Sequence, residues 1–276
     1  MIIRENSSIL IPIDFSKQSL LAVKHSYNLA RFTHSKLVFL NVYKQDEFEH
    51  ADELEALAKT TRAESGLEVS IINKKGDLYE VTDKTAEELN CNLIIAGLDS
   101  HVRFRSFMGT NVASKFIKNA PCPVITIRSN VTPTAVKNIV MPFDTSAESR
   151  EKVGMAVQVA KYYNADIRIV SVFHPSDTKY ENELLPYLHQ VKKFIKDKGV
   201  NCTNKSIPST MVAETIIEYA NKNDCDLIIQ MNKKDLSLGE MFSGTMSQKI
   251  VDLSNIPVLS VNPMVRESMS HFGSGM

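Results

Sequence analysis

The sequence lacks an excess of charge of either sign. Lys and Arg together number 32 among 276 residues, and Asp and Glu together also number 32. A chain of balanced charge has no electrostatic field suited to phosphodiester backbones or acidic membrane surfaces. We therefore expect neither nucleic acid nor a membrane among its partners.

Long hydrophobic segments are also missing. No run approaches the roughly 18 apolar residues that a membrane-spanning helix requires. Residues 1–6, Met-Ile-Ile-Arg-Glu-Asn, lack the apolar stretch of a secretory signal. We expect a cytoplasmic protein.

Cysteine is scarce, and its spacing indicates neither a metal site nor a disulfide framework. The four cysteines, Cys91, Cys122, Cys202 and Cys225, include no C-x-x-C pair and have no histidine at metal-ligand spacing. Cys91 and Cys225 directly precede apolar runs that predict buried strands. We interpret these two as small core residues rather than as reactive thiols.

What the sequence does contain is an internal repeat. An offset of 134 places residues 91–128 on residues 225–262 without a gap, with seven identities in 38 pairs. An offset of 130 places residues 9–42 on residues 139–172, with eight identities in 34 pairs. Random matching would give roughly two identities in either window. The chain is therefore a tandem duplication.

The repeat and the composition together predict two domains. A chain of 276 residues with 43% hydrophobic residues can bury two ordinary cores. Residues 129–134, Ser-Asn-Val-Thr-Pro-Thr, are short and polar, as a linker should be. We expect the domains at residues 1–130 and 136–265.

Each half alternates short apolar runs with segments of helical periodicity. In the first half the apolar runs predict strands at residues 8–13, 36–43, 67–73, 93–96 and 123–127. The second half repeats this order, and Glu181–Lys198 predicts a helix with Pro186 in its first turn. Strands that alternate with helices specify a parallel sheet with right-handed crossovers. We predict an α/β protein of two tandem doubly wound domains, each a five-stranded parallel sheet flanked by helices.

An aspartate ends the first strand of each half. Asp14 closes the run ILIPID, and Asp144 closes the equivalent run IVMPFD. In doubly wound sheets ligands sit beyond the carboxyl ends of the strands, at the topological switch point. A carboxylate there suits a ribose, because it accepts hydrogen bonds from two hydroxyls. The alternative interpretation is that each aspartate caps a helix.

These motifs resemble those of the universal stress protein family in its tandem two-domain form. The resemblance rests on ILIPIDFS and IVMPFDTS, on Ala-Pro-Cys-Pro-Val at 120–124, and on Asn-Ile-Pro-Val at 255–258. It covers nearly the whole chain and implies an adenine nucleotide alpha hydrolase-like fold. It also implies binding of ATP or AMP, with Mg²⁺ accompanying ATP, through a loop of the form G-x2-G-x9-G-[S/T/N].

The first half keeps part of that loop. Gly97 matches the first glycine, Ser100 stands at the second, and Thr110 and Asn111 stand at the last pair. Glycine suits such positions because backbone amides must approach phosphate oxygens closely, often at positive φ. Ser100 is a mild departure, since a hydroxyl can itself donate to phosphate. The resemblance implies a nucleotide site made of Asp14, near the adenine or ribose, Val42, which contacts the base through its backbone, and Gly97, Ser100, Thr110 and Asn111 around the phosphates.

The second half departs further from the pattern. Met231 and Lys234 replace the first two glycines, and only Gly244 and Thr245 keep the last pair. Side chains at the first two positions make a phosphate cradle improbable there. The resemblance therefore implies a degenerate second site at Asp144, Val172, Gly244 and Thr245.

Three functions follow from these patterns. The first is a stress-response regulator that binds an adenine nucleotide in the first domain, and the alternative is an interaction scaffold in which both loops have decayed. Enzymatic phosphoryl transfer is the weakest, because no Walker lysine motif, Mg²⁺-binding acidic pair or nucleophile–base pairing is present; we assign no catalytic residue and no metal ligand. The resemblance also implies that the last strands of the two halves pair within one chain. Composition does not decide whether two chains form a homodimer.

Overall fold

The computed structural model describes residues 4–44, 50–98, 112–128, 135–177, 180–232 and 245–262. Its first half begins with β1 (Ser8–Pro12), α1 (Lys17–Thr33), β2 (Lys36–Tyr43), α2 (Ala51–Ser65) and β3 (Val69–Lys75), and continues with α3 (Leu78–Glu88), β4 (Leu93–Gly97), α4 (Val112–Lys118) and β5 (Val124–Ile127). These five strands are parallel and follow the order β3-β2-β1-β4-β5. The predicted doubly wound sheet is confirmed.

The second half repeats the first. Its elements are β6 (Asn138–Pro142), α5 (Ala147–Tyr163), β7 (Asp166–Phe173), α6 (Tyr180–Asp197), β8 (Cys202–Pro208), α7 (Val212–Lys222), β9 (Leu227–Met231), α9 (Met246–Leu253) and β10 (Val258–Val261). The parallel order is β10-β9-β6-β7-β8.

The position predicted for Pro186 is wrong. Because α6 begins at Tyr180, this proline is the seventh helical residue and lies beyond the first turn. A proline there forgoes one backbone hydrogen bond. The buried residues Leu184, Leu188 and Ile195 recur at helical spacing along the same segment, so burial of this face outweighs that loss.

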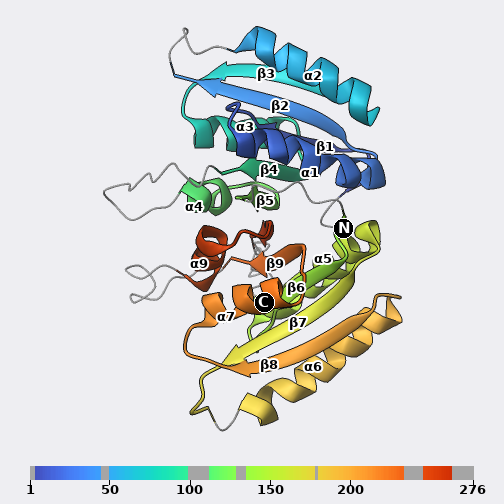
Figure 1. Ribbon diagram of the computed structural model, residues 1–276, viewed down its shortest axis with the longest axis vertical. Coiled ribbons are helices and arrows are strands. Elements are labelled where there is room, and N and C mark those ends of the chain that lie inside the picture. Colours follow the sequence, from blue (N-terminus) through green and yellow to red (C-terminus); the bar gives the residue numbers. More distant parts are fainter. Residues whose placement is uncertain are drawn as a thin grey trace, which may run out of the picture.

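The two halves share one ten-stranded sheet. At its centre β5 and β10 run antiparallel, with Ile125 opposite Leu259. Figure 1 shows the halves stacked along the long axis of the molecule, with this junction between them and β3 and β8 toward its two ends. Pairing the last strands buries two edges that would otherwise be open to aggregation. The expected pairing of the halves within the chain is thus observed.

Helices cover both faces of the sheet. Residues on alternate sides of β1 divide between two cores, since Ile9 and Ile11 face α1 and α2 while Leu10 faces α3 and α4. The second half distributes its helices in the same way, with α5 and α6 on one face and α7 and α9 on the other. Strands buried on both faces explain why the sequence shows continuous apolar runs rather than alternation. None of the described helices is long and apolar enough to cross a membrane.

Candidate functional site

The fold creates one topological switch point in each half. In the first half β1 and β4 are neighbours, and the chain leaves their carboxyl ends toward opposite faces of the sheet, to α1 and to α4. In the second half β6 and β9 are related in the same way (Figure 1). We call these two places the first and the second switch point.

Asp14 lies at the first switch point and organises the start of α1. Its Oδ1 accepts hydrogen bonds from the Ser16 amide (3.0 Å) and the Ser16 hydroxyl (2.6 Å). Ser16 is the N-cap, because its own Oγ accepts from the Ser19 amide at 3.2 Å. Asp14 is therefore not the cap; it holds the capping residue in place. Both of these bonds end on Oδ1.

The peptide groups of Val42 point toward the end of β1. The Ile13 amide donates to Leu40 O (2.8 Å), and the Gly76 amide donates to Tyr43 O on the other side of β2 (2.9 Å). Backbone groups alternate in direction along a strand, so the amide and carbonyl of Val42 face the same side as those of Leu40. Since β1 ends at Pro12, they face the switch point rather than a strand. Val172 is placed identically beyond the end of β6.

Gly97 is required by packing. A Cβ on this residue would lie 2.2 Å from the carbonyl carbon and oxygen of Gln18 and 2.4 Å from the Ser19 nitrogen. The first turn of α1 therefore rests directly on the end of β4. The sequence pattern suggested only the phosphate as the reason for a glycine here, whereas close helix–strand contact is a second and independent reason.

Four of the predicted site residues lie outside the described residues. They are Ser100, Thr110, Asn111 and Gly244. The described geometry therefore concerns Asp14, Val42 and Gly97 in the first half and Asp144, Val172 and Thr245 in the second.

The second switch point contains a buried cation that sequence reasoning missed. Lys152 of α5 is only 4% exposed, and its Nζ lies 3.2 Å from Ser149 Oγ. Asp144 makes the same contacts as Asp14, since its Oδ1 accepts from the Ser146 amide (2.9 Å) and hydroxyl (2.5 Å). Partial burial raises the pKa of the Asp144 carboxyl, but the hydrogen bonds from Ser146 and Ser149 and the charge of Lys152 outweigh it and lower the pKa overall.

Two substitutions distinguish the switch points. At the repeat offsets, Met231 stands where the first half has Gly97, and Lys152 stands where it has Ala22. Met231 and Lys152 are both buried. Because Met231 carries a Cβ, α5 cannot rest on β9 as closely as α1 rests on β4. Superposing the halves at an offset of 130 would have revealed the lysine from sequence alone.

Thr245 is the N-cap residue of α9. Its hydroxyl accepts from the Gln248 amide at 3.1 Å, and its amide donates to Gln248 Oε1 at 2.9 Å. This reciprocal arrangement is a capping box, in which the two residues satisfy each other's backbone groups. The amide of Thr245 is therefore occupied, whereas its hydroxyl hydrogen can still be donated to another group.

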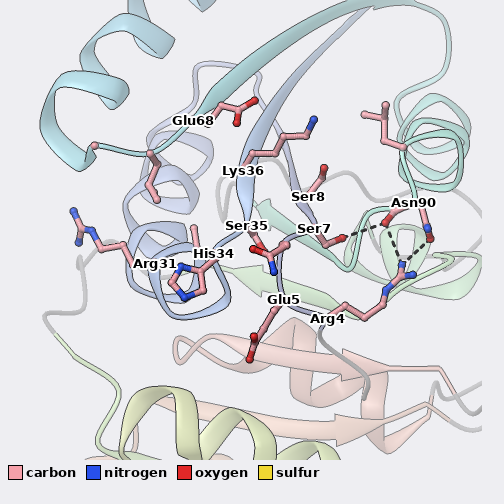
Figure 2. A pocket seen from close by; sticks show the side chains of 15 residues that line it. Arg4, Glu5, Ser7, Ser8, Arg31, His34, Ser35, Lys36, Glu68 and Asn90 are labelled. Carbon is pink, nitrogen blue, oxygen red and sulfur yellow. Dashed lines mark hydrogen bonds between the residues drawn. The ribbon is translucent and has the colours of Figure 1, made fainter.

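A hollow of about 810 Å³ lies at the opposite edge of the first sheet. Figure 2 shows it between the N-terminal segment and the amino ends of β1 and β2, with Arg4 hydrogen-bonded to Asn90. The C-terminal ends of α1, α2 and α3 meet here, and the helix dipole favours cations at such ends. Arg4, Lys36 and the acidic Glu68 are among its lining residues. Because it lies at the amino ends of the strands, the hollow is separate from the predicted site, which lies at their carboxyl ends.

The thiols match the interpretation given to them. Burial raises the pKa of Cys91 and of Cys225 to about 11, which disfavours the reactive thiolate. Within the described ranges all four cysteines are free, and no group of three His, Cys, Asp or Glu side chains could hold a metal ion.

Taken together, the sheet order and the acidic strand ends define a protein of two doubly wound α/β units with matching switch points. The model of the Universal stress protein family matches residues 5–128 and again residues 135–262. The chain therefore belongs to the universal stress protein family and carries two copies of its fold.

Known relatives are similar to parts or to the whole of the chain. Universal stress protein MJ0531 of Methanocaldococcus jannaschii is 27% identical over 145 residues, 48% of this chain and 85% of the relative. A crystal structure of a universal stress protein from Archaeoglobus fulgidus superposes with a TM-score of 0.77 at 17% identity, over 95% of this chain and 98% of that one. A functionally unknown protein, PA1789 of Pseudomonas aeruginosa, gives a TM-score of 0.71 at 23% identity, over 94% and 93%. These two structures share the fold across both halves.

Proposed function

We propose that the chain is a stress-response regulator that binds an adenine nucleotide, ATP or AMP, at the first switch point. In this proposal Asp14 Oδ2 accepts from the ribose, and the Val42 peptide groups bond to the edge of the base. The observation that carries it is that the Val42 peptide groups face the end of β1, where Asp14 stands two residues beyond the strand. Ser100, Thr110 and Asn111 would complete the site around the phosphates, with Mg²⁺ accompanying ATP.

The second switch point takes no nucleotide in this proposal. Met231 and Lys152 are both buried there. The positive charge that a phosphate would need is already paired with local oxygen atoms. We therefore expect one nucleotide for each chain.

A pair of matched variants tests the assignment. ATP and AMP, each with and without Mg²⁺, are added to the wild type, and unfolding is followed by thermal shift. At about a hundred times its dissociation constant a nucleotide should stabilise the protein by roughly 2.7 kcal/mol. Asp14→Ala should abolish this stabilisation, and Asp144→Ala should preserve it. Both variants lose the bonds to the capping serine of their helix, and Asp144→Ala also removes the negative charge near Lys152.

The second candidate is an interaction scaffold that binds no nucleotide. It is favoured by the filled second switch point and by the missing glycines at Ser100, Met231 and Lys234. A wild-type protein that shows no shift with any nucleotide would support this candidate and contradict the first. Equal losses in Asp14→Ala and Asp144→Ala would contradict the assignment to the first half.

A further inference from the structure

A side chain of the second half hydrogen-bonds to the C-terminal end of a helix in the first half. Asn262 directly follows β10, and its side-chain amide donates to Ile117 O (2.9 Å) and to Ala120 O (3.2 Å). Ile117 belongs to the last turn of α4, where carbonyls have no partner within the helix. Asn262 thus supplies the C-terminal hydrogen bonds of α4 from the other half of the molecule.

Asn232 fixes the orientation of Asn262. It directly follows β9, and its side-chain amide donates to Asn262 Oδ1 at 2.8 Å. That bond leaves the Asn262 amide group directed at α4. The main chain is tied at the same place, since the Asn232 amide donates to Val261 O at 2.8 Å. The two asparagines therefore form a continuous polar link from the end of β9 to the end of α4.

The first half has no asparagine pair at the equivalent positions. At the repeat offset of 134, Leu98 stands at the position of Asn232 and Arg128 at that of Asn262. The first half keeps the equivalent main-chain bond, from the Leu98 amide to Ile127 O at 2.8 Å. Leucine cannot orient a neighbouring amide by hydrogen bonding. The second half thus holds α4 without a matching asparagine pair at the equivalent positions of the first.

We propose that Asn232 and Asn262 are a positioning pair through which the second half sets the nucleotide affinity of the first. This inference rests on the proposed function, because α4 directly follows Thr110 and Asn111, the expected phosphate contacts. A helix held at its C-terminal end is restrained as a unit, and this restraint extends to Val112, the residue at which α4 begins. The positioning pair also gives the second half a role, although the switch point of that half is filled.

Asn262→Asp is the sharpest test, because it keeps the shape of the side chain and removes both donated bonds to α4. We expect ATP binding to weaken about threefold to tenfold, the range for one or two lost hydrogen bonds. Asn232→Leu, which installs the residue found in the first half, should weaken ATP binding in the same direction. Arg128→Ala, at the matching position of the first half, should leave affinity unchanged. Titration calorimetry measures all four proteins.

Hydrogen exchange separates this inference from the proposed function. In the nucleotide-free protein, Asn262→Asp should speed exchange of the α4 amides and leave those of α7 unchanged. Unchanged exchange in α4 would overturn the inference even if the wild type binds ATP. Faster exchange with unaltered ATP affinity would also overturn it, because the pair would then be structural only. A wild type that binds no ATP defeats the proposed function and, with it, the claim about affinity, while the exchange result still shows whether the pair holds α4.

Discussion

The two halves share a fold and differ at the place where ligands bind in such folds. At the first switch point α1 rests on Gly97, and a Cβ there would meet backbone atoms at 2.2 Å. At the second, Met231 stands at the end of β9, and Lys152 in the second turn of α5 is buried. The capping serine and its aspartate are nevertheless the same in both. The comparison teaches that the strand-to-helix junction belongs to the fold, whereas the space beside it is free to change.

The largest expected effect comes from adding a methyl group at Gly97, where α1 contacts the end of β4. Gly97→Ala should cost about 4 kcal/mol or more of unfolding free energy, because the atoms in the way are backbone atoms that cannot turn aside. Gly154→Ala in α5 is the control: its added Cβ meets nothing within 4 Å, so it should gain roughly 0.5–1 kcal/mol. Urea unfolding measures both. A small loss of unfolding free energy in Gly97→Ala would show that α1 can move away from β4 and accommodate the added methyl group.

The second effect concerns a histidine that has a methionine as its counterpart. His25 of α1 stands where α5 has Met155, and burial lowers the pKa of His25 to about 4. Its Nε2 is buried and has no hydrogen-bond partner within the part of the chain that the structure describes. Below pH 6.5 the imidazole of His25 becomes protonated in the unfolded chain but stays neutral in the native state. Stability should therefore fall by about 3 kcal/mol between pH 6.5 and pH 4 through this group.

His25→Met isolates that contribution. The wild-type curve also contains Asp83, whose pKa burial raises to about 6, so the native state gains stability from that group as the pH falls from 6 toward 3.8. The difference between the unfolding free energies of His25→Met and the wild type cancels Asp83. It should grow on acidification from pH 6.5 to pH 4. A difference that does not depend on pH would contradict the assignment to His25.

The third prediction is one of equality. Ser16→Ala and Ser146→Ala each remove an N-cap hydroxyl with the same geometry, so each should cost about 1 kcal/mol of unfolding free energy. Denaturant unfolding of the two variants side by side checks the match. Clearly unequal costs would mean that the conserved junction is not energetically equivalent in the two halves.

The smallest effect is expected at Lys152. Lys152→Met removes a positive charge near Asp144, so the pKa of Asp144 should rise, although less than in Ser146→Ala, which removes a direct hydrogen bond. Unfolding free energy at neutral pH should change by less than about 1 kcal/mol, because an apolar side chain of similar length replaces a buried charge. Carboxyl NMR titration reads the pKa. The reverse order of the two variants would make Lys152 the dominant partner of Asp144.

The sequence was sufficient for the fold because its signals are local and occur twice. The apolar runs give β1 and β6, Ser16 and Ser146 give the helix starts, and the repeat offset fixes the order of the elements. Single residues were harder to interpret. Gly97 was linked to phosphate alone, because its contact with Gln18 depends on how two distant segments meet.

Long-range contacts explain what was missed. Lysine usually occupies exposed positions, so the sequence alone shows that Lys152 replaces Ala22 but does not show that Lys152 is buried. Asn232 and Asn262 belong to no local motif, and their link to α4 exists only because the halves share one sheet. The expected residues Ser100, Thr110, Asn111 and Gly244 remain predictions.

The antiparallel junction of β5 and β10 has a further consequence, since both strands belong to one polypeptide. Two separate copies of such a unit would come apart on dilution, and every mutation would appear in both of them. Covalent linkage keeps the local concentration of each partner high at any protein level. It also lets one partner change while the other is preserved, so that α5 carries Lys152 while α1 keeps alanine at the matching position, Ala22.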